Sequence, residues 1–408
     1  MQIALDWIGR QVRNGRLEFV APDGRRWSLG HGEPRASVRV RDAGVLLRIL
    51  RNPTLAFPET YMDGAWEPED GDLRKVIEAA TQVAAALDGG RLAKITKSVG
   101  SRIGEWNTPL LARRNVSHHY DIDYALYSRF LDADLHYSCA YYPRDDMTLE
   151  QAQQAKCAHI ANKLSLRPGM RVLDIGCGWG SLAMYLAEQH GVKVVGITLS
   201  KEQLAVAKQR TKERGLDRWV EFRLQDYRQT QDRFDAVVSV GMFEHVGRPQ
   251  YASFFQHVFD RLSPDGVALL HTIGRSSEPG GTNAWVRKYI FPGGYCPAAS
   301  EVLTALEPSK LILTDLEVLR LHYAKTLAAW HQRFQAARDF AKAQLGERFC
   351  RMWEFYLLSA EANFRWGELV VFQFQLTRDL LRLPLERSYL YSEQPENALV
   401  QARRRRGV

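Results

Sequence analysis

A regular alternation of strand-like and helix-like segments between residues 171 and 273 restricts the fold of this chain more than any other feature. Each short apolar run is followed by a stretch in which apolar residues recur every three or four positions, as in an amphipathic helix. This alternation predicts a parallel, doubly wound α/β sheet, because a parallel strand must be reached through a crossover connection. The predicted strands are RVLDI (171–175), VKVVGI (192–197), FDAVVSV (234–240) and GVALLHTI (266–273), and the predicted helices cover 181–190, 200–214 and 250–262.

The N-terminal residues 1–87 predict a smaller α+β domain. The strand-like runs RLEFV, RRWSL and SVRVR precede two helical patterns at 43–50 and 73–87, which a Pro- and Gly-bearing segment separates. A chain of 408 residues is too long for one ordinary core, which agrees with two domains. The basic segment 88–115 is interpreted as a linker. Residues 116–408 then form the second domain, with a helix pair predicted at 323–360 and a last strand at 369–376.

Charge and cysteine usage limit the partners and the compartment. The formal net charge of +8 indicates an anionic partner, either nucleic acid or an acidic membrane surface. No apolar run is long enough to span a bilayer, so a lipid substrate would have to be met from the membrane surface. The five cysteines are scattered and never form C-x-x-C, which argues against a disulfide framework and a zinc site and favours a reducing cytoplasm.

A glycine-rich turn follows the first strand of the alternating region. In DIGCGWG (174–180) an acid ends the strand, and a G-x-G-x-G turn leads into a helix whose N-terminus can meet an anionic group. A dinucleotide fingerprint needs G-x-G-x-x-G, and here the third glycine comes one residue early. The acid before the first glycine favours a methyltransferase, in which this turn holds the amino-acid part of S-adenosylmethionine. A tight structural turn remains the alternative.

Other candidate cofactor residues follow the neighbouring strands. No acid ends the second strand, but Thr198, Ser200 and Gln203 can supply hydrogen bonds; Ser200 is interpreted equally well as a helix N-cap. Asp226 and Tyr227 are candidates for pairing with and stacking on adenine, and the ring of Tyr137 for a cation–π contact with the sulfonium. The complete predicted cofactor set is Tyr137, Ser138, Asp174, Gly176, Cys177, Gly178, Gly180, Thr198, Leu199, Ser200, Gln203, Asp226 and Tyr227.

Beyond these motifs the chain resembles the cyclopropane-fatty-acyl-phospholipid synthases and the related mycolic acid cyclopropane synthases and methyltransferases. The matching segments cover nearly all of residues 116–390 in the order of that family, and the N-terminal domain matches more weakly through ETYMDGAW. The segments are VSHHYDIDYALY, LHYSCAYY, VLDIGCGWG, GITLSKEQ, VGMFEHVG, LLHTIG, KYIFPGGYCP and LRLHYAKTLAAWHQRF.

The resemblance implies a set of catalytic residues. In this family a methyl group is added to a cis double bond, and a bound bicarbonate is thought to take the proton whose loss closes the cyclopropane ring. Glu244, His271, Tyr323 and the backbone around Cys139 and Ile273 are implied as the groups that hold it. Glu244 beside an anion requires that one of the two carries a proton.

Each of these residues also has a structural interpretation. Glu244 could cap the following helix, and His271 could be a satisfied core histidine. Tyr323 on a helix would ordinarily be a core aromatic, and the Cys139 sulfur is expected to pack rather than react. His245 is interpreted as structural, because it need not share the direction of Glu244.

The favoured hypothesis is a cytoplasmic, homodimeric enzyme at the inner face of the membrane that cyclopropanates unsaturated phospholipid acyl chains and binds no nucleic acid. The closest alternative is a related C-methyltransferase that gives methyl- or methylene-branched chains or uses another acyl carrier. A nucleic-acid methyltransferase would need a D-P-P-Y or Pro-Cys signature, and neither occurs. The third alternative is a non-catalytic lipid-binding protein. For residues 1–87, dimerisation is favoured over lipid docking.

Overall fold

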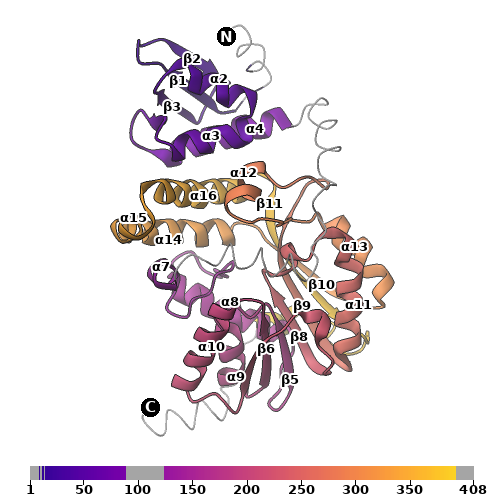
Figure 1. Ribbon diagram of the computed structural model, residues 1–408. Helices are drawn as coiled ribbons and strands as arrows, with labels where there is room; N and C mark the ends of the chain where they lie inside the picture. Colours follow the sequence, from indigo (N-terminus) through magenta and orange to yellow (C-terminus); the bar gives the residue numbers. More distant parts are fainter. Residues whose placement is uncertain (1–8, 10–11, 13, 89–123, 392–408) are drawn as a thin grey trace. The chain divides into compact units, whose positions relative to one another are not determined.

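The computed structural model describes residues 9, 12, 14–88 and 124–391, and the chain divides into two compact units (Figure 1). Within the described residues, the first unit combines the N-terminal part up to residue 88 with Gly280–Pro292 and Ala324–Leu369. The second unit holds 124–279, Gly293–Tyr323 and 370–391. The segment predicted as the second domain, 116–408, therefore contributes to both units. The predicted linker 88–115 lies almost entirely outside the described residues, so the domain boundaries stay predictions.

The first unit contains a four-stranded sheet with the order β2-β1-β3-β4. The strands and the two helices that the sequence predicted in this region are confirmed, but the connecting segment between those helices contains a further helix, α3, which starts at a proline. Proline suits the first turn of a helix, because its missing N–H has no partner there anyway. The elements up to residue 88 are β1 (Arg16–Val20), β2 (Arg26–Leu29), β3 (Arg35–Val40), α2 (Ala43–Arg51), α3 (Pro53–Met62), β4 (Trp66–Pro68) and α4 (Leu73–Asp88).

The predicted helix pair at 323–360 is wrong, because three helices occupy this part of the chain. Gly346, with φ of +82°, separates the last two, and a left-handed backbone conformation of this kind favours glycine. The helices are α14 (His322–Ala336), α15 (Arg338–Leu345) and α16 (Glu347–Trp366), and α12 (Ala284–Tyr289) belongs to the same unit.

The second unit is built on a seven-stranded sheet with the order β10-β11-β9-β8-β5-β6-β7. The predicted doubly wound arrangement is confirmed: β7, β6, β5, β8 and β9 run parallel, and β10 pairs with β11 in the antiparallel sense. The strands are β5 (Arg171–Ile175), β6 (Lys193–Thr198), β7 (Val220–Leu224), β8 (Phe234–Val240), β9 (Leu262–Arg275), β10 (Ile312–Leu319) and β11 (Leu369–Thr377).

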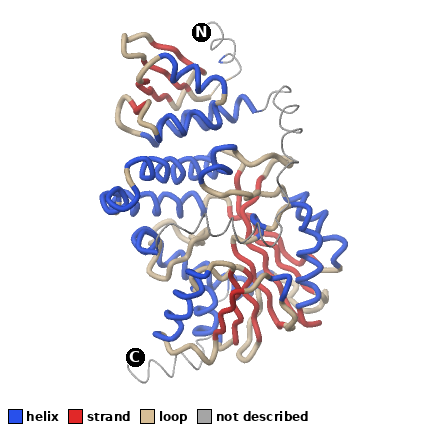
Figure 2. Tube along the Cα trace, in the orientation of Figure 1, coloured by secondary structure: helices blue, strands red, loops and turns tan. Residues whose placement is uncertain are grey.

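Helices cover both faces of this sheet (Figure 2). Successive strand residues point to opposite faces, so Val172 packs in one apolar core and Leu173 in the other. The helices α8, α9 and α10 contribute to the core of Val172, and α11 and α13 contribute to the core of Leu173. Their bounds are α8 (Leu149–Lys163), α9 (Ser181–His190), α10 (Lys201–Glu213), α11 (Tyr251–Arg261) and α13 (Ala299–Leu306), and a short helix α7 (Tyr124–Phe130) precedes them.

Helix α8 buries polar side chains as well as apolar ones. Gln153, Lys156, His159 and Lys163 are all fully or almost fully buried, although their spacing places them on adjoining parts of one helix face. Near the C-terminal end of α8, Glu317 of β10 lies 2.6 Å from both His159 Nε2 and Lys163 Nζ. Burial by itself would raise the pKa of Glu317, but the hydrogen bond from His159 and the charge of Lys163 lower that pKa to about 2. This buried ion network joins α8 to β10.

No helix within residues 14–88 or 124–391 is long and apolar enough to cross a membrane.

The substitution Glu317→Gln should lower the free energy of unfolding by about 3 kcal/mol at pH 7, because it leaves the buried Lys163 ammonium with weaker compensation. Urea unfolding at pH 7 measures this loss. Adding Lys163→Met removes the uncompensated charge, so the double variant should be more stable than Glu317→Gln alone. Wild-type stability of Glu317→Gln would show that the ion network does not bear on folding.

Candidate active site

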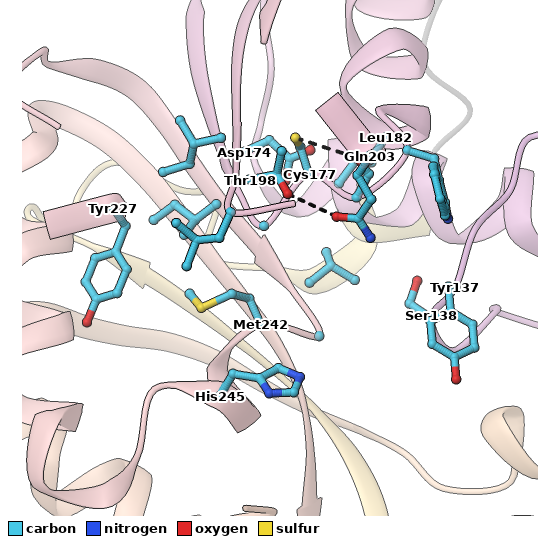
Figure 3. A pocket seen from close by; sticks show the side chains of 18 of the residues that line it. Tyr137, Ser138, Asp174, Cys177, Leu182, Thr198, Gln203, Tyr227, Met242 and His245 are labelled. Atoms are coloured by element: carbon cyan, nitrogen blue, oxygen red, sulfur yellow. Dashed lines mark hydrogen bonds between the residues drawn. The ribbon is translucent and has the colours of Figure 1, made fainter. Parts of the chain in front are cut away.

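A cavity opens at the carboxyl ends of β5, β6 and β8, where the sequence predicted a ligand site (Figure 3). The turn after β5 forms one wall. Gly176 has φ of +86°, and a Cβ atom at this position would lie only 2.8 Å from Cβ of Met242. Glycine is therefore required here both by the backbone conformation and by the close approach of the neighbouring loop.

The cavity is lined by every residue of the predicted cofactor set except Gly180 and Ser200. Gly180 precedes α9, and a Cβ atom there would lie 2.6 Å from the ring of Phe222. Ser200 caps α10, where its side chain accepts a hydrogen bond from Gln203 N at 3.2 Å. The N-cap interpretation of Ser200 is thus confirmed. Gly180 and Ser200 do not line the cavity themselves.

Aromatic side chains lie toward both ends of the cavity. Tyr227 lies toward one end, and Tyr137 and Ser138 lie toward the other (Figure 3). The Asp226 carboxylate accepts two hydrogen bonds from the Arg228 guanidinium, at 2.8 and 2.6 Å. If Asp226 binds a ligand, its carboxylate does so while it is also paired with Arg228.

Asp174 brings a buried carboxyl group to the wall of the cavity. Its Oδ2 atom has no hydrogen-bond partner among the described residues. Burial raises the pKa of Asp174 to about 7, and the positive charge of Lys156 opposes this rise only in part. A cationic ligand group at this carboxyl would compensate the cost of burying its charge.

Four further ionisable residues of the lining were not assigned to the site from the sequence: His136, Lys156, Arg228 and His245. Lys156 lies on α8, a helix that the sequence pattern did not predict, so no signal marked it. His245 was interpreted as structural, yet its ring borders the cavity (Figure 3), whereas its neighbour Glu244 is not part of the lining. Burial lowers the pKa of His245 to about 4, so its imidazole is neutral at pH 7.

Glu244 and Ile273 form the centre of a second group of predicted residues. The main-chain N–H of Ile273 donates to Glu244 Oε1 at 2.6 Å, so Glu244 does not cap the following helix with this atom. Its other oxygen, Oε2, has no hydrogen-bond partner in the described part of the chain. Burial raises the pKa of Glu244 to about 7, although the Ile273 hydrogen bond acts in the opposite direction.

His271 lies on β9, two residues before Ile273 and therefore on the same face of the strand. It is 3% exposed, and Gln373 Nε2 on β11 lies 3.0 Å from its Nδ1. Burial lowers the pKa of His271 to about 3. The imidazole is neutral at pH 7 and can act as a hydrogen-bond donor through one nitrogen.

The remaining two predicted catalytic residues are also buried. Burial raises the pKa of the Cys139 thiol, so this sulfur is not a thiolate nucleophile at neutral pH. The main-chain N–H and C=O of Cys139 take part in no hydrogen bond with residues that the structure describes. Tyr323 is buried at the second position of α14 and does not line the cavity.

Comparison with known proteins shows which family of proteins this chain is similar to. Residues 109–374 match the family described as mycolic acid cyclopropane synthetase. The chain is 40% identical over 350 residues to the cyclopropane-fatty-acyl-phospholipid synthase of Escherichia coli (strain K12), covering 85% of this chain and 89% of the relative. It is 34% identical to the tuberculostearic acid methyltransferase UfaA1 of Mycobacterium tuberculosis, covering 92% and 91%.

A solved structure of a protein from the same family is also similar to this chain. The mycolic acid cyclopropane synthase CmaA1, complexed with SAH and CTAB, is 37% identical and superimposes with a TM-score of 0.61 over 65% of this chain and 97% of its own. The predicted class I, Rossmann-like methyltransferase fold is thereby confirmed.

Replacing Asp174 by Asn should stabilise the ligand-free protein in a pH-dependent way. The pKa of Asp174 rises from an ordinary value of 3.8 to about 7 on folding, so its carboxyl costs stability progressively between about pH 4 and pH 7. The variant should therefore melt at a higher temperature than the wild type at pH 8, and the gain should nearly vanish at pH 4.5. Thermal unfolding at both pH values measures this.

The exposed Asp146 provides the control, because Asp146→Asn should change the melting temperature little at either pH. A gain for Asp174→Asn that is equal at pH 8 and pH 4.5 would contradict the raised pKa.

Proposed function

Because the chain belongs to the mycolic acid cyclopropane synthetase family, which consists of S-adenosylmethionine-dependent enzymes, we propose that it cyclopropanates cis-unsaturated acyl chains of phospholipids. The observation that carries this proposal is the pairing of two features at one sheet edge. A cavity lies at the ends of β5, β6 and β8, and the hydrogen-bonded Glu244–Ile273 pair lies at the ends of β8 and β9.

The lining of the cavity fits S-adenosylmethionine. The orphaned carboxyl oxygen of Asp174 suits the ammonium of the amino-acid end, and Tyr227 offers a ring face for adenine. When bound, the cofactor supplies an electrophilic methyl group on a sulfonium. Tyr137, at the end of the cavity away from Tyr227, can present its ring to that positive charge.

The extent of the sequence match supports phospholipid as the acyl carrier. The Escherichia coli relative aligns over 85% of this chain and 89% of its own length. Cyclopropane mycolic acid synthase 1 of Mycobacterium tuberculosis aligns over only 64% of this chain, although 95% of its own length is covered. The chain therefore shares its larger size with the phospholipid enzyme.

The reaction needs a proton acceptor after methyl transfer rather than before it. The π electrons of the alkene form the new C–C bond as the S–CH3 bond breaks, which leaves a carbocation on the acyl chain. Loss of a proton from the added methyl group then closes the three-membered ring. Aromatic and apolar surroundings exclude water, which would otherwise trap the cation as an alcohol.

Bicarbonate is proposed as the group that accepts this proton, and the described residues fit it. Glu244 Oε2 and the main-chain groups of Cys139 are buried polar atoms that need partners. A pKa of about 7 lets Glu244 carry a proton beside an anion, since two adjacent negative charges would be unfavourable. His271 is neutral and can donate a hydrogen bond without competing for the proton.

A branched product is the second candidate. The match to a tuberculostearic acid methyltransferase over 92% of this chain favours it, because that relative is named for a branched-chain product. The same carbocation gives a branched, still unsaturated chain if it loses a proton from a neighbouring carbon of the acyl chain instead of from the added methyl group.

Incubation with S-adenosylmethionine and vesicles of cis-monounsaturated phospholipid distinguishes these products. We expect the released fatty acids to gain one CH2 by mass spectrometry, to lose the alkene proton signals and to show upfield ring protons by NMR. The same mass gain with alkene protons retained or moved would instead identify a branched product. No mass gain with phospholipid would reject this carrier.

The substitutions Glu244→Gln and His271→Ala should each lower kcat by about 100-fold or more, because each removes a group that holds the proton acceptor. Binding of S-adenosylhomocysteine, measured by calorimetry, should stay within about threefold of the wild type. The exposed Glu202→Gln is the matched control and should keep full turnover. Full turnover of either active-site variant would reject its role.

The location of the enzyme follows from its proposed substrate and its charge. A net charge of +8 favours peripheral binding to the anionic inner face of the membrane, and a homodimer formed through the N-terminal part is proposed with it. Co-sedimentation with anionic vesicles should be strong at low salt and lost at high salt, because exposed charges are screened. Binding that persists at high salt would contradict an electrostatic attachment.

A further inference from the structure

Lys156 is a buried cation that no carboxylate of the described residues contacts directly. It lies in the middle of α8, is 1% exposed and lines the cavity. Its Nζ donates to Ser138 Oγ at 3.0 Å, and no carboxylate of a described residue lies within 4.0 Å of it. The buried carboxyl groups of Asp132 and Asp174 are close enough to interact with its charge but do not contact it. A negatively charged ligand group in the cavity could contact the ammonium directly and compensate the cost of its burial.

Asp174 presents the complementary situation in the same cavity. No described residue donates a hydrogen bond to its Oδ2, and its carboxyl group does not contact Lys156 within the described residues. The two groups are nevertheless close enough for the charge of Lys156 to lower the pKa of Asp174 against the effect of burial. The lining of the cavity therefore carries a positive charge on Lys156 and a negative charge on Asp174, and the two groups do not contact each other.

This pair of separated charges matches a zwitterion. The amino-acid end of S-adenosylmethionine carries an ammonium and a carboxylate on one carbon atom, and a zwitterion is bound most tightly where each charge meets its opposite. We propose that Lys156, together with the hydroxyl of Ser138, binds the cofactor carboxylate, while Asp174 binds the ammonium. The inference rests on the proposed use of this cavity for S-adenosylmethionine and adds the group that recognises its carboxylate.

Neighbouring contacts keep Lys156 and Ser138 in place for this role. Gln153, one turn earlier on α8, donates to the main-chain oxygen of Ser138 at 3.0 Å. The main-chain N–H of Tyr141 donates to Ala152 O of the same helix at 3.1 Å. The segment that carries Ser138 is thus held against α8 at the serine and three residues after it, so the ammonium and the hydroxyl line the cavity as a preorganised pair.

The test compares ligands that differ only at the amino-acid end. Isothermal titration calorimetry measures binding of S-adenosylhomocysteine and of its decarboxylated analogue, which keeps the ammonium. The wild type should bind S-adenosylhomocysteine about 10- to 100-fold more tightly, as expected for a buried charge-assisted contact. Lys156→Met should weaken S-adenosylhomocysteine by the same factor and change the decarboxylated analogue by less than about threefold.

Two control variants separate charge from structure. Asp174→Asn should weaken both ligands by a similar factor, because both carry the ammonium. Ser138→Ala should weaken S-adenosylhomocysteine alone, and by less than Lys156→Met.

Three outcomes would overturn the inference or its premise. Equal affinity of the wild type for the two ligands would show that the carboxylate is not recognised. An unchanged preference in Lys156→Met, with a higher bicarbonate concentration needed for half-maximal turnover, would assign the ammonium to the proton-acceptor site instead. Failure of the wild type to bind S-adenosylhomocysteine at all would reject the proposed cofactor itself.

Discussion

The candidate site depends on charged groups that are held out of water at the carboxyl edge of one parallel sheet. Asp174, Glu244 and Lys156 are each almost fully buried, and burial raises the pKa of both acids to about 7. Burying an uncompensated charge costs stability, and a protein retains such groups mainly where a ligand compensates them. The fold thus holds an unfavourable electrostatic arrangement that ligand charges can relieve.

Helix α8 provides the support for this arrangement. It carries Lys156 in its middle, and at its C-terminal end Lys163 and His159 share the carboxylate of Glu317. The same helix packs Cys157, Ile160 and Ala161 into one of the two apolar cores of the sheet. Apolar packing therefore fixes the helix, and the fixed helix keeps a cation beside the cavity that would otherwise move toward water.

The alternation of strands and helices in the parallel sheet could be predicted from the sequence, because the apolar runs in β5, β6, β8 and β9 indicate buried strands. The turn at Gly176 and the residues that follow each strand could be predicted for the same reason, since parallel strands end at one sheet edge. The role of Lys156 could not be predicted, because a lysine in a helix with other polar residues normally indicates a solvated face.

The predicted helix pair was wrong because Gly346 interrupts the helical segment, and neither a proline nor a polar cluster marks this break in the sequence. The division of the chain into units, in which 324–369 joins the N-terminal part, depends on long-range contacts that no local pattern records.

A crystal structure of the protein with bound S-adenosylhomocysteine would test the charge arrangement most directly. We predict the ligand carboxylate beside Lys156 and Ser138, its ammonium beside Asp174, and its adenine toward Tyr227. A ligand bound in the reverse direction, or with its amino-acid end away from both Lys156 and Asp174, would contradict the proposal that these buried charges exist to bind a zwitterion.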